Sequence, residues 1–227
     1  MMKFTRTPEP NQAGFTIVEL MIALSIFTTI LLLSSILLIR LGSIFTKGTN
    51  QASAQNVART LVDDISSQLE FSGVAPIQYL SSSNNSSNPN VVCFGTSRYT
   101  YLINHRVSGD SLDHGLWRDT LNTDSTCQAN MNFSSENHPH DGLNPTGNGV
   151  ELLPEGMRLT QLDVVANTDS YTVTVTVAYG EEDLVNFVQA SAGPPAVETS
   201  TSCNQTTGSQ YCAVASLSRT VSRRIGN

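Results

Sequence analysis

The longest apolar pattern in the chain runs from Phe15 to Ile39, and Glu19 is the only side chain within it that carries a formal charge. These 25 residues would form a helix of roughly 37 Å, long enough to cross a hydrocarbon core of about 30 Å. A secretory signal has a shorter apolar region, of about 7 to 15 residues. The pattern therefore predicts a membrane-spanning helix over residues 15–41 that stays with the mature protein.

A second helical pattern follows the first. Between Gln51 and Phe71, apolar residues recur at the three-and-four spacing of one helical face; they are Ala54, Val57, Ala58, Leu61, Ile65 and Leu69. We expect an amphipathic helix over residues 42–72 that packs on a folded domain. Gly42 and Gly48 would either hinge the helix or only loosen it, and Gly73 followed by Pro76 is a stop signal.

Alternating positions predict strands in the rest of the chain. The clearest alternation is Tyr171–Tyr179, preceded by residues 157–166, and residues 211–225 form a weaker closing strand. Short β-prone runs cover residues 91–94, 99–103 and 116–121. Polar tracts at about 76–90 and 122–148 are interpreted as variable loops. A helix followed by antiparallel strands predicts an α+β domain over residues 73–227.

Composition favours an exported domain. The net charge is −7 and only 14% of residues are charged, so no nucleic-acid-binding surface is predicted. Four cysteines suit an oxidising exterior. Sequence proximity favours a bridge between Cys203 and Cys212, with Cys93 and Cys127 remaining, although four cysteines allow three connectivities. No Cys-x-x-Cys pair is present, which argues against a zinc site.

Two histidine-containing groups have the residue types of metal ligands, but neither has a supporting spacing. We interpret both as solvated surface, and the sequence predicts no metal, no cofactor and no catalytic site, because the usual catalytic and nucleotide-binding motifs are absent. Sequons for N-glycosylation matter only in a host that uses them. The first group is His138, Pro139, His140 and Asp141, and the second is His105, Asp110, Asp113 and His114. Sequons begin, among other positions, at Asn85, Asn132 and Asn204.

The start of the apolar run resembles a known signal. A short leader with Lys3 and Arg6 ends at Gly14, and Phe-Thr-Ile-Val-Glu-Leu follows at residues 15–20. This pattern is similar to the class III signal of type IV prepilins and type II secretion pseudopilins. The resemblance implies a pilin-like fold, in which a long N-terminal helix packs on an antiparallel sheet. It also implies that prepilin peptidase removes the leader, residues 1–14, and methylates the new amine on Phe15.

The same resemblance implies a location and partners. The chain would first span the cytoplasmic membrane once, with its N-terminus inside and its C-terminus outside. It would then join other pilin subunits at an inner-membrane assembly platform and reach the pilus or cell surface.

Glu19 is the residue that this interpretation explains best. A charge at bilayer depth costs roughly 2.5 to 3.5 kcal/mol, so it usually has a function and a partner. A freed Phe15 amine is largely cationic at neutral pH, and Glu19 of an incoming subunit would pair with it during assembly. The alternative is a carboxylate that only complements the helix dipole, worth about 0.3 to 1 kcal/mol.

Several functions remain open at this point. The absence of Pro and Gly from residues 15–41 and the size of the mature chain favour a minor pilin or pseudopilin that initiates or tips a filament. A major pilin is the nearest alternative. A membrane-anchored surface module for binding or adhesion belongs to another class, but such an anchor has no use for Glu19. The absence of catalytic motifs argues against a single-pass enzyme.

Overall fold

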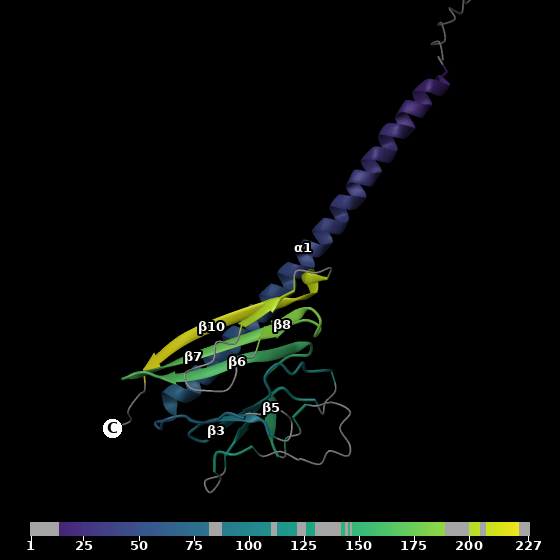
Figure 1. The fold of residues 1–227 in the computed structure, drawn as a ribbon. Helices are drawn as coiled ribbons and strands as arrows, with labels where there is room; N and C mark the ends of the chain where they lie inside the picture. Colours follow the sequence, from purple (N-terminus) through teal and green to yellow (C-terminus); the bar gives the residue numbers. More distant parts are fainter. Residues whose placement is uncertain are drawn as a thin grey trace, which may run out of the picture. The chain divides into compact units, whose positions relative to one another are not determined.

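The structure is a computed structural model that describes residues 14–81, 88–109, 113–121, 126–129, 142–143, 145, 147–188, 200–204 and 208–222. The chain divides into two units, residues 1–44 and 45–227, and helix α1 (Ile17–Phe71) contributes to both (Figure 1). All the strands belong to the second unit.

Helix α1 is a single helix of 55 residues. Gly42 and Gly48 both lie inside it, so neither glycine ends the helix. It ends at Phe71, and Gly73 then takes φ 67°, a left-handed conformation that glycine adopts without steric cost. The predicted stop signal is therefore confirmed.

One face of α1 is buried inside the second unit, at the predicted positions. Val57 is half-buried, and Val62 and Ser66 widen the face beyond the predicted set. The small residues Ala54 and Ala58 allow close approach to the sheet. The fully buried residues of the face are Ala54, Ala58, Leu61, Val62, Ile65, Ser66 and Leu69.

The first sheet is a five-stranded antiparallel meander whose strands lie in chain order. Strands β2, β3 and β4 match the three short predicted runs closely. The strands are β1 (Ile77–Tyr79), β2 (Asn90–Phe94), β3 (Ser97–Tyr101), β4 (Leu116–Thr120) and β5 (Gly149–Glu151).

The two outer strands of this sheet were not predicted. Strand β1 lies within the segment interpreted as a loop over residues 76–90, so that interpretation is wrong at Ile77–Tyr79. Three residues are too few to show an alternation, and all three side chains are exposed. Strand β5 is equally short, and its pairing with Trp117, Arg118 and Asp119 of β4 depends on tertiary structure.

The second sheet has three long antiparallel strands in the order β10–β7–β6. Strand β6 (Met157–Ala166) and strand β7 (Ser170–Tyr179) confirm their predictions. Val173, Val175 and Val177 of β7 point into the core. On the opposite face, hydroxyls pair across strands, with 2.7 Å between Thr174 Oγ1 and Ser218 Oγ. This division explains the strict alternation of valine and threonine.

The closing strand β10 (Ala213–Ser222) is shorter than the predicted residues 211–225. Tyr211 instead ends the 3₁₀ helix η1 (Ser209–Tyr211), and residues 223–227 lie outside the described residues. A third sheet, of β8 (Val185–Val188) and β9 (Ser200–Cys203), was not predicted.

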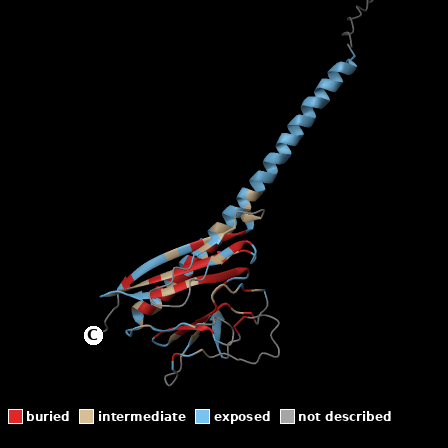
Figure 2. Ribbon diagram, viewed as in Figure 1, coloured by how far each residue is buried: buried red, intermediate tan, exposed pale blue. Residues whose placement is uncertain are grey.

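The main core lies between α1 and the two larger sheets. Ile65 of the helix, Leu116 of β4 and Val175 of β7 are all completely buried within it. Figure 2 shows these buried stretches on the helix and strands of the second unit. The predicted α+β class, with a long N-terminal helix packed on antiparallel sheets, is confirmed.

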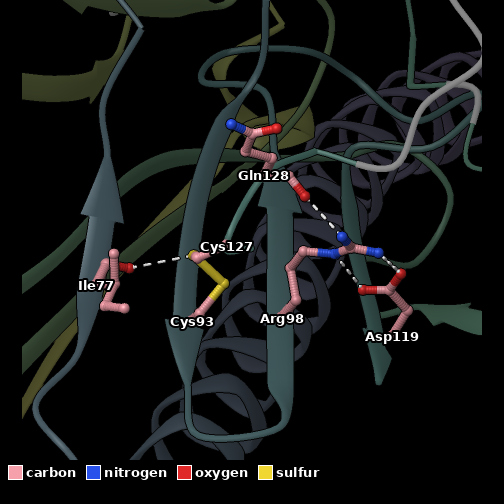
Figure 3. Close-up of a disulfide and its surroundings, with 6 residues drawn as sticks. All are labelled: Ile77, Cys93, Arg98, Asp119, Cys127 and Gln128. Carbon is pink, nitrogen blue, oxygen red and sulfur yellow. Dashed lines mark hydrogen bonds and ion pairs between the residues drawn. A yellow bond between two sulfur atoms is a disulfide. The ribbon is translucent and has the colours of Figure 1, made fainter. Parts of the chain in front are cut away.

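The four cysteines form two disulfides. Cys93 of β2 joins Cys127, and the same short segment is bound again where Arg98 Nη1 donates to the Gln128 carbonyl oxygen at 2.6 Å (Figure 3). Cys127 Sγ also lies 3.7 Å from the Ile77 carbonyl oxygen. Because a disulfide sulfur carries no hydrogen, this is a contact and not a hydrogen bond. Residues 126–129 are thus tied to the face of the first sheet.

The second disulfide, Cys203–Cys212, closes the loop that contains η1. Two side chains of α1 hold this region within the second unit. Asn50 Nδ2 donates to the Gln210 carbonyl oxygen at 3.1 Å, and Gln51 Nε2 donates to the Val214 carbonyl oxygen at 3.0 Å. The C-terminal loop therefore lies beside the start of the packed part of α1.

The two disulfides should contribute unequally to stability. Their sequence separations are 34 and 9 residues, for which chain entropy gives about 4 and about 2.7 kcal/mol. Denaturant unfolding should show that Cys93→Ser with Cys127→Ser costs roughly 1 kcal/mol more than Cys203→Ser with Cys212→Ser. Equal losses, or the reverse order, would contradict the assignment of the longer loop as the stronger constraint.

Candidate functional site

The residues that the sequence singled out lie in the first turn of α1 and just before it. Gly14 and Phe15 precede the helix and are exposed. Glu19 is also exposed, and its Oε2 atom accepts hydrogen bonds from Thr16 N at 3.3 Å and Thr16 Oγ1 at 3.1 Å. Glu19 N in turn donates to Thr16 Oγ1 at 3.2 Å. The two residues form a reciprocal capping box.

Thr16 is the residue that sequence reasoning missed. Its spacing to Glu19, a threonine followed three residues later by a glutamate before an apolar run, is the sequence signature of a capping box. Glu19 uses only Oε2 in these bonds, and Oε1 has no hydrogen bond among the residues that the structure describes. One carboxylate oxygen therefore stabilises the helix, while the other is available to a further donor.

The helix surface that follows is apolar on every side. All residues from 14 to 42 are exposed, and the large apolar side chains from Phe15 to Leu41 are 49–83% exposed. A soluble helix normally buries such residues along one stripe. The exposed part of α1 is long and apolar enough to cross a membrane.

The hydroxyl groups in this apolar segment are satisfied within the helix. Ser25, Thr28 and Thr29 each donate to the carbonyl oxygen three residues earlier, at 2.7–2.9 Å. Ser34 and Ser35 donate to the carbonyl four residues earlier, at 2.8 and 2.9 Å. Because unpaired polar groups are costly in hydrocarbon, this arrangement suits an apolar environment. Glu19 remains the single formal charge between Phe15 and Ile39.

The interpretation of the second histidine group as solvated surface is wrong for His105, Asp113 and His114, which take part in two largely buried carboxylate pairs of the second unit. His105 Nε2 lies 2.6 Å from Asp113 Oδ1, and Ser108 N donates to Asp113 Oδ2 at 2.6 Å. Burial alone would raise the pKa of Asp113. The hydrogen bonds from Ser108 and the pairing with His105 outweigh burial, so the pKa of this carboxyl lies below its ordinary value.

His114 belongs to the second pair, with 3.5 Å between its Nδ1 atom and Glu151 Oε2. Glu151 also accepts backbone hydrogen bonds from Gly115, Leu116 and Leu153 at 2.8–3.3 Å. These contacts tie β5 to β4 and account for the carboxylate structurally. Within the described ranges, no group of three or more His, Cys, Asp or Glu side chains could hold a metal ion.

Other predicted positions can be placed only in part. Asn204 is half-buried, and its Nδ2 atom donates to the Asp183 carbonyl oxygen at 2.6 Å. The remaining ones lie outside the described residues: Asp110, His138, Pro139, His140, Asp141, Asn85, Asn132 and residues 1–13 of the leader.

Comparison with known proteins bears on the N-terminal segment. A family model described as the prokaryotic N-terminal methylation motif matches residues 10–35. This range includes Gly14, Phe15, Thr16 and Glu19. No curated protein and no solved structure matches the chain.

The motif marks the type IV pilin and pseudopilin family, and here it is joined to a pilin-like α+β fold. The protein is thus a pilin-like subunit of a type IV pilus or type II secretion filament, and its role is structural and not enzymatic. The motif implies processing by prepilin peptidase and assembly with other pilins. The apolar helix that carries it indicates anchoring in the inner membrane before entry into the filament.

We predict that the pair of His105 and Asp113 stabilises the fold in a pH-dependent way. Since folding lowers the pKa of Asp113 below 3.8, its stabilisation is present above that pH and is lost as pH falls through the folded pKa. Asp113→Asn should lower the free energy of unfolding by about 1 to 3 kcal/mol at pH 7. The difference in the free energy of unfolding between this variant and the wild type should begin to decrease below about pH 4.

The measurement is denaturant unfolding followed by near-ultraviolet circular dichroism between pH 3 and pH 7. Asp169→Asn, in the exposed turn between β6 and β7, is the control and should change little. A constant difference for Asp113→Asn across this range would rule out the ionised pair as the source of stability.

Proposed function

We propose that the chain is a minor pilin or pseudopilin that is cleaved after Gly14, methylated on Phe15, and inserted into a filament through the apolar part of α1. The observation that carries this proposal is the position of Glu19, in the first helical turn and five residues after Gly14, on a helix with an exposed apolar surface. Cleavage after Gly14 would place a new amine on Phe15, one residue before the capping box.

Glu19 is proposed to have two roles, one as a helix cap within its own chain and one as an ion-pair partner of a neighbouring subunit. Its Oε2 atom caps the helix through Thr16, at a distance of 3.1 Å from the hydroxyl. Its Oε1 atom would accept the Phe15 amine of a neighbouring subunit. Removing one partner of such a desolvated pair costs roughly 3 to 5 kcal/mol. A helix inserted out of register would leave both charges unpaired, so the pair would select the correct axial offset.

Features of the helix and of the second unit support the proposal that the chain is a minor subunit of the filament. The helix has no Pro or Gly between residues 15 and 41, and the second unit carries two larger sheets, a third small sheet and two disulfides. A second unit of this kind suits a subunit that initiates a filament or lies at its tip. The proposed topology before assembly has the N-terminus in the cytoplasm and the disulfide-containing unit outside, where disulfides persist.

Two substitutions separate the two roles of Glu19. Glu19→Gln keeps an acceptor for the capping box but removes the charge, whereas Thr16→Val removes the hydroxyl and keeps the charge. We expect Glu19→Gln to be strongly depleted from sheared filaments, in line with the roughly 3 to 5 kcal/mol cost of an unpaired charge. Thr16→Val should lose only about 1 kcal/mol of helix stability and still assemble.

The readout is the ratio of filament-bound to membrane-bound subunit, by immunoblotting of sheared and membrane fractions. Both variants must first show normal levels in the membrane. If Glu19→Gln assembled normally, or if only Thr16→Val failed, the intersubunit pair would be wrong and the carboxylate would act as a cap alone.

A further prediction concerns maturation. Intact-mass and N-terminal analysis of the membrane form should find a chain that begins at Phe15 and carries one added methyl group on its amine. Replacing Gly14 with a bulky residue, as in Gly14→Leu, should leave the leader attached. Gly42→Leu is a matched control, because Gly42 is also exposed on the N-terminal unit. A mature chain that began elsewhere would overturn the assignment of the cleavage site.

A further inference from the structure

The second unit contains a polar cavity of about 320 Å³ that neither the methylation motif nor the assembly helix accounts for. Its size falls at the lower end of the range for small-molecule pockets, about 300 to 1,000 Å³. The cavity lies where the end of α1 meets strands β3, β4 and β5. Its lining residues are Gln68, Ser97, Arg118, Asp119, Thr120, Asn148, Gly149 and Val150.

Hydrogen bonds and ion pairs hold the walls of this cavity in place. Arg118 pairs with Asp64 of α1, and Tyr99 Oη donates to the other oxygen of Asp64 at 2.8 Å. Partial burial alone would lower the pKa of the Arg118 guanidinium. The Asp64 carboxylate favours the charged form and outweighs burial, so this pKa is raised. Figure 3 shows the second pair, in which Arg98 binds both oxygens of Asp119, with 2.8 Å between Nε and Oδ1.

These pairs also neutralise the charges of the lining residues. The cation of Arg118 is matched by Asp64, and the anion of Asp119 is matched by Arg98. An anionic or cationic ligand would therefore meet a site with no excess charge of the opposite sign. The cavity can still offer the polar N–H and O–H groups of uncharged side chains.

Several such groups are available for a ligand. Gln68 accepts a hydrogen bond from Ser97 Oγ at 2.7 Å, which leaves the Gln68 amide nitrogen as a donor. Thr120 and Asn148 are exposed and make no side-chain hydrogen bond to any part of the chain that the structure describes. Val150, which is 44% exposed, adds an apolar contact.

Gly149 allows Trp117 to pack closely against β5 beside the cavity. A Cβ atom at this position would lie 2.3 Å from Trp117 Nε1 and 2.6 Å from the Arg118 carbonyl oxygen. The absence of a side chain lets the indole ring pack against β5, on the face of the strand opposite to Val150. The site itself is formed where the end of α1 packs against the first sheet.

We propose that this cavity binds a neutral saccharide unit, either a free sugar or the terminal residue of a glycan. Amide and hydroxyl groups from three separate elements match the alternating donors and acceptors of sugar hydroxyls. The apolar Val150 would contact a C–H face of the ring. This proposal does not depend on the assembly role, because the lining residues all belong to the second unit.

The test uses the full mature chain in lipid nanodiscs, since glycoside detergents would themselves present sugars. Saturation-transfer nuclear magnetic resonance is recorded with glucose, galactose and N-acetylglucosamine, and the same sugars are presented as terminal units of immobilised glycans. Wild-type protein should bind at least one of them in one of the two forms. Gln68→Ala combined with Asn148→Ala should weaken that binding about tenfold or more, because two hydrogen-bonding groups are lost.

A matched control is Gln55→Ala combined with Asn186→Ala, which removes the same residue types from exposed positions of α1 and β8. It should bind sugars as wild type does, and both double variants should retain wild-type circular dichroism. The proposal is overturned if no sugar binds in either form, if the two double variants behave alike, or if inorganic phosphate displaces the sugar from the cavity.

Discussion

Helix α1 meets two different requirements along its 55 residues. Between Ala54 and Leu69 it buries one apolar face against the sheets, as helices of soluble domains do. Between Phe15 and Leu41 its large apolar side chains are exposed on every side. A helix satisfies its own backbone hydrogen bonds, so its side chains alone decide which surroundings suit each part. Hydrocarbon or the apolar helices of neighbouring subunits would supply what the first part lacks.

The first turn shows how a carboxylate can belong to such a surface. Glu19 has a partner inside its own chain, because the backbone N–H and the side-chain hydroxyl of Thr16 both donate hydrogen bonds to it. This local solution lowers the cost of the charge at the end of the helix, where the dipole also favours an acid. It does not use the whole carboxylate. The proposed intersubunit pair and the capping box are therefore compatible.

Polar contacts connect the same helix to the rest of the second unit. Asp64 is the central residue, because it receives both the Tyr99 hydroxyl and the Arg118 guanidinium. Burial and the hydrogen bond to Asp64 raise the pKa of Tyr99, so its hydroxyl remains a proton donor throughout the physiological range. The contacts that join helix to sheet also shape the wall of the polar cavity. Fold and proposed saccharide site thus share one group of residues.

Periodicity found the elements that are long. The predicted face of α1, the valine and threonine alternation of β7 and the antiparallel α+β class are all confirmed. Strands β1 and β5 were not predicted, because three residues are too few to show a periodic pattern. Each forms only by pairing with a neighbouring strand of the folded sheet. Asp63 and Asp64 are adjacent aspartates on the same helix. Only packing made one the surface partner of Arg219 and the other the hub of a half-buried network.

The sequence by itself determined the apolar helix, the methylation motif around Gly14 and the exposed carboxylate of Glu19, because each depends on residues close together in the chain. The tertiary structure decided the connectivity of Cys93 with Cys127, the pairing of His105 with Asp113 and the cavity beside Gly149. These features join residues that are distant in sequence or belong to different elements. Their proximity arises only when the sheets and the helix pack together.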